Sequence, residues 1–237
     1  MAQQLEPDAG TPSGRGGARR LGTALVAVPA ACLGALALMG LVFASGPPPQ
    51  LIGHLDEFAD GLALFQWGFV GASLIAPTFI ATLVLLLAAA RVPLDSSRRW
   101  VASVLLAGYL VLATIAYTSQ YTFLPRLVER DPQAAALWYL HDAGSITYAL
   151  DLTGYALLAL AAIVIATTLG AHGARLRWIA RCLVAMGILS LAALGLHAAD
   201  HGTAASVATI SSAAFTLPVL LLAILVGRDL RRALLAA

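Results

Sequence analysis

Six long apolar runs, separated by short polar connections, dominate the pattern of the chain. Each run has about 20 residues or more, enough to cross a hydrocarbon core of roughly 30 Å as an α-helix. No window alternates apolar and polar positions in the short segments typical of a membrane β-barrel. We therefore predict an all-α fold, a polytopic transmembrane helix bundle of about six spans. The runs cover residues 21–45, 62–90, 100–124, 144–169, 182–200 and 205–227.

The two ends of the chain differ from this bundle. Residues 1–20 are rich in Gly, Pro, Ala and Arg and lack an apolar period, so we predict a disordered cytoplasmic tail. The first apolar run is longer than the roughly 7 to 15 residues of a signal-peptide core, which favours a retained anchor. Residues 228–237 read as a short basic cytoplasmic tail. One transmembrane domain, residues 21–227, lies between the tails.

Composition supports the same class. The mean hydropathy is +0.86, with 60% hydrophobic and 11% charged residues, whereas a soluble domain has roughly 25% charged residues. We expect a multi-pass protein of the cell membrane, with the lipid bilayer as its main partner. The two cysteines, Cys32 and Cys182, form no CxxC motif and are interpreted as buried structural thiols.

Arginine sets the predicted orientation, because the chain has no lysine. Twelve of the 14 arginines precede the first run, follow the last, or lie in the second and fourth connections. The positive-inside rule then places both termini in the cytoplasm. The net charge of +2 reflects this topology and gives no reason to expect nucleic acid as a partner. The twelve are Arg15, Arg19, Arg20, Arg91, Arg98, Arg99, Arg175, Arg177, Arg181, Arg228, Arg231 and Arg232.

Acids and histidines show the opposite bias. Eight of the twelve acids fall on the predicted outer side: Asp56, Glu57, Asp60, Glu129, Asp131, Asp142, Asp151 and Asp200. Four of the five histidines join them, namely His54, His141, His197 and His201. Of these groups, Asp151 is the one that lies well inside an apolar run, at roughly 10 Å of depth from residue 144 at 1.5 Å per residue.

Helical spacing places aromatic side chains around Asp151. Tyr148 and Tyr155, at i−3 and i+4, share its helix face. The outer end of the third run adds polar and aromatic residues, among them Tyr117, Gln120 and Tyr121, and the fifth run ends with His197, Asp200 and His201. We expect a polar, aromatic-lined chamber that opens toward the outer half of the bundle.

Each of these residues also has a plainer interpretation. A carboxylate at this depth costs roughly 2.5 to 3.5 kcal/mol on insertion, so it needs a partner. A structural bond of Asp151 to Gln120, Tyr117 or Arg126 satisfies that need as well as a functional role does. Trp67 fits either a chamber wall or an interfacial aromatic belt.

The sequence predicts neither a metal site nor a cofactor. His197 and His201 have the spacing of a helical metal pair, but the intervening residues are not those of HExxH and no third ligand is evident. The segment "DEFAD", residues 56–60, is similar to the aspartate-rich magnesium motif of prenyl-transferring enzymes. It carries glutamate at the second position and has no second copy, so we interpret it as a solvated loop.

Three segments carry a resemblance. "GASLIAPTFIATLVLLLAAARVPL", a span that ends "YTSQYTFLPRL", and "ITYALDLTGYALLALA" resemble a widespread, largely uncharacterised group of bacterial six-helix membrane proteins. The resemblance covers residues 65–168 and implies architecture. The chain is also similar in length and helical character to the small membrane-bound terpene cyclases of actinobacterial and fungal meroterpenoid pathways. These enzymes use buried acids without a metal motif.

The second resemblance implies a lipophilic isoprenoid substrate, and the residues allow that chemistry. Protonation of an alkene or epoxide needs a neutral carboxylic acid, which an apolar site favours, and the carbocation needs a dry, aromatic cavity. Asp151 is the candidate donor, with Glu57 and Asp60 as further candidate acids and His197 or Asp200 as the final base. Candidate substrate-binding residues are Tyr117, Gln120, Tyr121, Tyr148, Tyr155 and Trp67. Two alternatives remain open: a small-solute or proton-coupled carrier that relays protons through Asp151, and a membrane sensor or regulatory protein.

Overall fold

The computed structural model describes residues 12–91, 95–199 and 204–235, and this part of the chain folds into helices without strands. The first three are α1 (Pro12–Ala44), α2 (Leu55–Ala90) and α3 (Ser96–Thr122). Two short helices follow, α4 (Leu124–Arg130) and α5 (Pro132–Ala136). The chain then forms α6 (Ile146–Leu169), α7 (Ala174–Ala198) and α8 (Ala204–Leu235).

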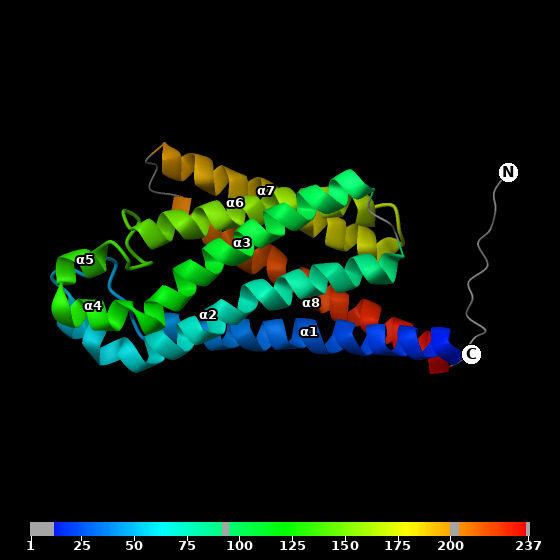
Figure 1. Cartoon of the computed structure of the whole chain (residues 1–237), viewed down its shortest axis with the longest axis horizontal. Helices are drawn as coiled ribbons and strands as arrows, with labels where there is room; N and C mark the ends of the chain where they lie inside the picture. The colour runs from blue at the N-terminus through cyan, green and yellow to red at the C-terminus, as the bar shows by residue number, and fades with distance from the viewer. Residues whose placement is uncertain (1–11, 92–94, 200–203, 236–237) are drawn as a thin grey trace.

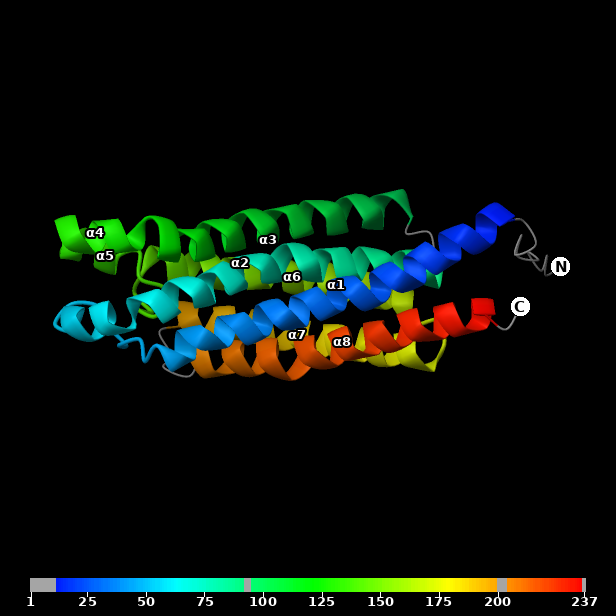
Figure 2. The same ribbon diagram turned by 90° about the horizontal axis from the view of Figure 1, so that it is seen from below.

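The six long helices form a closed ring. Each long helix packs against the long helices that precede and follow it in the chain, so α3 packs against α6, although α4 and α5 separate the two in sequence. Helix α1 packs against α8 and closes the ring. Figures 1 and 2 show the long helices running side by side, with α4 and α5 at one end of the bundle. Because the first and last helices are neighbours, α1 and α8 can contribute side chains to the same interior space.

Five helices in the described part of the chain are long and apolar enough to cross a membrane. They correspond to the first five predicted spans, so the predicted all-α bundle is confirmed, and the five helices are consistent with multi-pass character. The sixth predicted span, residues 205–227, lies within α8, which is not one of these five, and its membrane crossing remains a prediction. The five spans are Gly16–Ala44, Leu55–Ala90, Ser97–Thr122, Ile146–Leu169 and Ala174–Ala198.

The helices extend beyond the apolar runs at several ends. Residues 12–20, which the sequence placed in a disordered tail, are helical, and α8 continues to Leu235 through the predicted basic tail. The segment "DEFAD" is also helical, so the prediction of a loop there was wrong. Its acids are exposed in the first turns of α2, where negative charge stabilises a helix N-terminus. Apolar runs mark the part of a helix that suits lipid, and the helix itself continues into the polar flanks.

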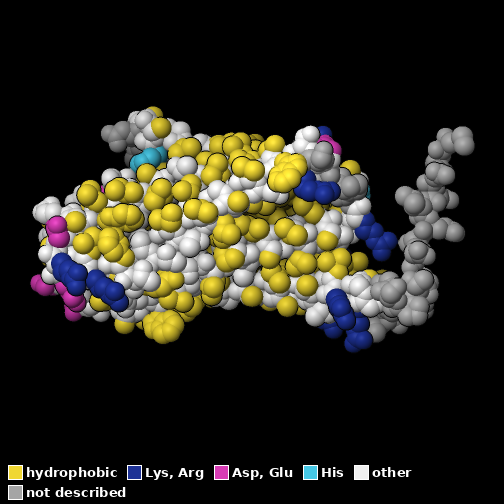
Figure 3. Space-filling model, viewed as in Figure 1, with side chains coloured by type: hydrophobic (Ala, Val, Ile, Leu, Met, Phe, Trp, Pro, Cys, Tyr) yellow, Lys and Arg dark blue, Asp and Glu magenta, His cyan; other side chains and the backbone are white. Residues whose placement is uncertain are grey.

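Charge is segregated between the two ends of the ring. The arginine end holds the start of α1, the α2–α3 and α6–α7 connections, and the end of α8, together with the twelve arginines of the predicted cytoplasmic side. The acidic end holds the α1–α2 connection, the start of α2, α4, α5 and the segment before α6, with six of the acids. In Figure 3 the middle of the visible face is largely hydrophobic, and charged side chains gather toward the two ends.

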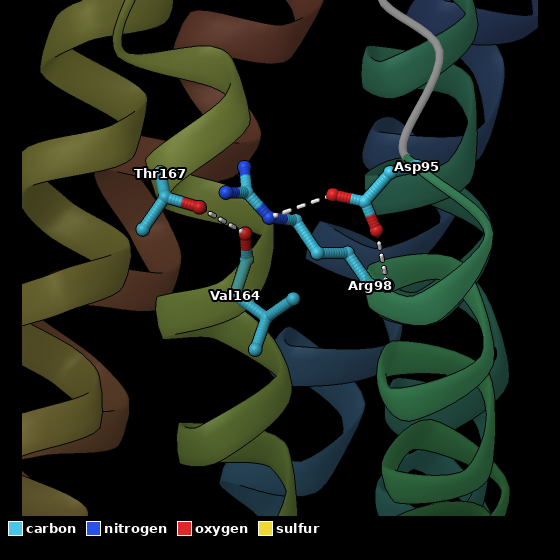
Figure 4. Close-up of polar contacts among 4 residues, drawn as sticks. All are labelled: Asp95, Arg98, Val164 and Thr167. Carbon is cyan, nitrogen blue, oxygen red and sulfur yellow. Dashed lines mark hydrogen bonds and ion pairs between the residues drawn. The ribbon is translucent and has the colours of Figure 1, made fainter.

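Local contacts fix the helices at the arginine end. The Asp95 carboxylate accepts a hydrogen bond from the Arg98 backbone N–H at 2.7 Å, which caps α3, and pairs with the Arg98 guanidinium at 3.1 Å. Figure 4 shows both contacts, beside the Thr167 hydroxyl that donates to the Val164 carbonyl in α6 at 2.8 Å. Arg175 of α7 pairs with Asp229 of α8. The Arg175–Asp229 pair joins two neighbours in the ring, whereas the other contacts lie within α3 and within α6.

Helices α1 and α2 approach closely because small residues face each other. A Cβ on Gly71 would lie 2.8 Å from the Met39 backbone nitrogen and 2.9 Å from the Ala35 carbonyl oxygen. Backbones in membrane bundles are brought together in this way by glycine, since lipid supplies little hydrophobic drive for helix association. Cys32 is buried in α1 and Cys182 is half-buried in α7, both as free thiols.

Candidate functional site

A cavity of about 320 Å³ lies inside the ring. The described residues that line it come from α1, α2, α3, α6, α8 and the segment before α6. Most are apolar, and the polar or ionisable ones are few. The aliphatic lining is Leu36, Met39, Val42, Ala72, Ile75, Leu140, Leu152, Leu158 and Leu217, and the remainder is Phe43, Phe69, Phe79, Tyr109, Tyr117, His141, Tyr148, Asp151, Tyr155 and Thr216.

Asp151 is the acid of this cavity. Ser145 caps α6 by accepting a hydrogen bond from the Tyr148 backbone N–H at 3.1 Å. The helix that starts there turns Tyr148, Asp151 and Tyr155 onto one face, and all three line the cavity, as their spacing predicts. The Asp151 Oδ1 atom is buried and has no hydrogen-bond partner. A buried acceptor without a partner is uncommon and costly in a folded protein.

Tyrosines from two helices surround the acid. The Tyr117 side chain of α3 interacts with the Asp151 carboxyl, and its hydroxyl lies 3.1 Å from the Tyr155 hydroxyl of α6. The ring of Tyr109 packs against that of Tyr155 with centroids 5.9 Å apart. The sequence allowed three structural partners for Asp151, and Tyr117 is the one that lies beside it. Arg126 is exposed on α4, and among the described residues no arginine pairs with Asp151.

His141 lines the same cavity and was missed as a site residue. It lies between α5 and α6, in contact with three rings at centroid distances of 5.9 Å for Phe65, 6.1 Å for Phe69 and 5.4 Å for Tyr139. Its Nδ1 atom is buried without a hydrogen-bond partner. Burial among these groups lowers the pKa of His141 from 6.5 to about 4, so the imidazole is neutral at neutral pH. The signal that the sequence offered was the clustering of His141 with the acids on the predicted outer side.

Gln120 has a structural role in the segment that carries His141. Its amide nitrogen donates to the Trp138 carbonyl at 2.8 Å, and its amide oxygen accepts from the Leu140 backbone N–H at 3.1 Å. The side chain is fully buried and does not line the cavity. Tyr139 adds a second attachment, because its hydroxyl donates to the Pro48 carbonyl at 2.6 Å. The Gln120 bonds hold residues 138–140 against the end of α3, and the Tyr139 bond attaches them to the α1–α2 connection, so that together they position His141.

The other predicted site residues lie elsewhere. Trp67 is 61% exposed on the outside of the bundle, so it does not belong to the cavity wall and fits the aromatic belt instead. Glu57 and Asp60 are exposed on α2, outside the cavity lining. Tyr121 is half-buried near the end of α3, also outside the lining.

His197 and Asp200 belong to the end of α7 and the connection after it. His197 reaches the site indirectly, since its ring packs edge-on against Tyr148 with centroids 5.1 Å apart. Asp200 and His201 lie outside the described residues. Within the described part of the chain, no group of three His, Cys, Asp or Glu side chains is placed to hold a metal ion.

The cavity reaches the outer surface of the ring. Phe43 of α1 and Leu217 of α8 line it, yet they are 67% and 46% exposed. These two helices are neighbours in the ring. Exposed lining residues on these two helices therefore open the cavity to the outside of the ring between α1 and α8.

Comparisons of the chain with protein-family models, curated proteins and solved structures find no match. Fold and site together define the class, an α-helical membrane bundle with an apolar internal cavity that presents one carboxyl group, one imidazole and several tyrosines. Such a cavity can bind an apolar molecule. It can also give a proton from Asp151, accept one at His141, and place aromatic faces beside positive charge.

Proposed function

We propose that the protein is a multi-pass enzyme of the bacterial cell membrane that cyclises a lipophilic isoprenoid through acid-initiated carbocation chemistry. The observation that supports the proposal is the placement of Asp151, with an unpartnered oxygen, in an apolar cavity walled by tyrosine and phenylalanine rings. A proton donor, a dry space and aromatic faces are the three requirements of such a reaction. In the proposed orientation both termini are cytoplasmic and the cavity lies toward the outer half of the bundle.

In the proposed reaction Asp151 gives its proton to a terminal alkene carbon or to an epoxide oxygen of the substrate. The resulting cation is attacked by a neighbouring double bond, which forms the new carbon–carbon bond and moves the positive charge along the chain. Rings of Tyr117, Tyr155 and Phe69 lie along the cavity to stabilise that charge. Loss of a proton from the last cation gives an alkene, so product and substrate are isomers.

We assign the final base to His141 instead of His197 or Asp200. His141 lines the cavity and has a free ring nitrogen, whereas His197 contacts it through Tyr148. A low pKa of about 4 makes His141 a weak base, but a proton next to a carbocation is so acidic that a weak base suffices. The low pKa also keeps the imidazole unprotonated, so that it can accept a proton.

The proposal is tested by turnover in membranes that contain the wild type or a variant at matched protein level. With a farnesylated or epoxyfarnesylated acceptor, we expect wild type to form a cyclised isomer of unchanged mass. Asp151→Asn keeps size and hydrogen bonding but lacks the acid, so conversion falls by about 100-fold or more. Asp151→Glu keeps the acid with altered reach and retains part of the activity.

The matched control is Glu57→Gln, which removes an exposed acid outside the cavity and leaves conversion unchanged. Wild-type conversion by Asp151→Asn would exclude Asp151 as the donor. Absence of conversion by wild type on isoprenoid acceptors would contradict the cyclase and favour the carrier or sensor alternatives.

A further inference from the structure

The described lining of the cavity carries no fixed positive charge but includes an acid with an unpartnered oxygen. The chain has no lysine, and among the described residues no arginine lines the cavity. The described titratable groups of its lining are Asp151, His141 and four tyrosines, Tyr109, Tyr117, Tyr148 and Tyr155. Since His141 is neutral at neutral pH, nothing among them supplies positive charge to Asp151. A carboxylate in such surroundings gains most from a cationic ligand.

The walls suit a cation whose remaining surface is hydrocarbon. Phe69 and Tyr117 pack with ring centroids 6.2 Å apart, and Tyr109 and Tyr155 at 5.9 Å. Aromatic faces attract ammonium groups, and more strongly when both are removed from water. The rest of the lining is aliphatic, and a volume of about 320 Å³ is at the small end of ligand cavities, which run from roughly 300 to 1,000 Å³.

We propose that this cavity binds lipophilic amines as cations, with Asp151 as the counter-ion and the rings of Tyr117, Tyr155 and Phe69 as the walls around the ammonium group. The hydrocarbon part of the ligand lies against the aliphatic residues and enters between α1 and α8, past Phe43 and Leu217. An ammonium ion is also a stable counterpart of the carbocation in the proposed reaction. The inference uses the same site but does not depend on turnover, so the two are tested separately.

The test uses the full-length protein in a nonionic detergent and two probes of equal chain length. One is dodecyltrimethylammonium and the other is dodecanol, its neutral counterpart. Equilibrium dialysis at fixed detergent concentration gives the affinity of each probe after subtraction of micelle uptake. We expect wild type to prefer the ammonium probe by about tenfold or more.

Asp151→Asn is expected to lose that preference and to retain the affinity for dodecanol. Glu57→Gln, an exposed acid outside the cavity, keeps the wild-type preference and controls for net charge. Equal affinities of wild type for the two probes would overturn the proposal, and this comparison needs no variant that must fold. An unchanged preference in a folded Asp151→Asn variant would overturn it too. If wild type prefers the ammonium probe but does not convert an isoprenoid, the proposed reaction is contradicted and the proposed cation site is supported.

Discussion

His141 lies among the rings of Phe65, Phe69 and Tyr139, and this burial lowers its pKa to about 4. Burial also raises the pKa of the neighbouring Tyr139 hydroxyl, with a smaller contribution from the charge of Asp142. Both shifts disfavour the charged form of a group that has been taken out of water. The His141 and Tyr139 side chains, in the segment between α5 and α6, are therefore uncharged at neutral pH.

The shift at His141 predicts a pH dependence of stability. The unfolded chain protonates this imidazole near pH 6.5 and the folded protein only near pH 4, so between these values the unfolded state binds more protons. The free energy of unfolding then rises by at most about 3 kcal/mol as the pH increases from about 4 to 6.5. Above pH 6.5 the contribution of His141 no longer changes. His141→Phe keeps an aromatic ring and removes this pH-dependent contribution to stability.

Thermal unfolding of both proteins in detergent from pH 4.5 to 7.5 measures the effect. We expect a shallower rise of the melting temperature with pH for His141→Phe than for wild type. Asp142, Asp151 and Tyr139 are present in both proteins, so the difference reports on His141. Parallel curves would show that His141 is solvated in the folded protein.

At the scale of helices, α1 and α2 are matched by small residues along one seam. Gly68 and Gly71 face the backbone of α1, and Gly61 faces the Ser45 carbonyl just after α1, so closely that a Cβ would clash. The sequence reveals the glycines but not which of them face a neighbour. Gly40 of α1 shows the contrast, because a Cβ there meets nothing within 4 Å.

This contrast gives a paired prediction. Gly71→Ala forces α1 and α2 apart and is expected to destabilise the protein by about 1 to 3 kcal/mol. Gly40→Ala has space and removes a poor helix former, so its stability is expected to equal or slightly exceed wild type. The fraction of protein that stays monodisperse in size-exclusion chromatography after heating measures both. Equal loss in the two variants would contradict the close seam.

At the scale of the whole molecule, charge divides the ring into two ends. The arginine end contains both the start of α1 and the end of α8, as Figures 1 and 2 show. Asp151, about one and a half turns from the start of α6, lies in the half of the bundle nearer the acidic end. Orientation in the membrane therefore decides from which side of the bilayer the cavity is approached.

The positive-inside rule predicts that orientation. Fusions of green fluorescent protein after Arg98 or Arg177 should fluoresce, because these connections are cytoplasmic. Alkaline phosphatase fused after Pro48 or Gln133 should be active, because it is exported. Swapping the two reporters at each position is the control. The reverse pattern would place the cavity toward the cytoplasm.

Much of this architecture was predictable from local sequence. Twenty-residue apolar runs indicate helices in lipid because each backbone group must be satisfied within its own segment. The i, i+3 and i+4 spacing of Tyr148, Asp151 and Tyr155 determines their common face, and the structure places all three in one cavity. These features depend on neighbours within a few turns of one helix.

Other features depend on contacts between segments far apart in the chain, and only the tertiary structure decided them. Closure of the ring brings Phe43 of α1 and Leu217 of α8 to the cavity, and the bonds of Gln120 fold the segment before α6 back so that His141 enters it. The rotation of α2 turns Trp67 outward. Helical periodicity fixes which residues share a face. Which helix that face meets is set by packing of all the helices together, which no single run encodes.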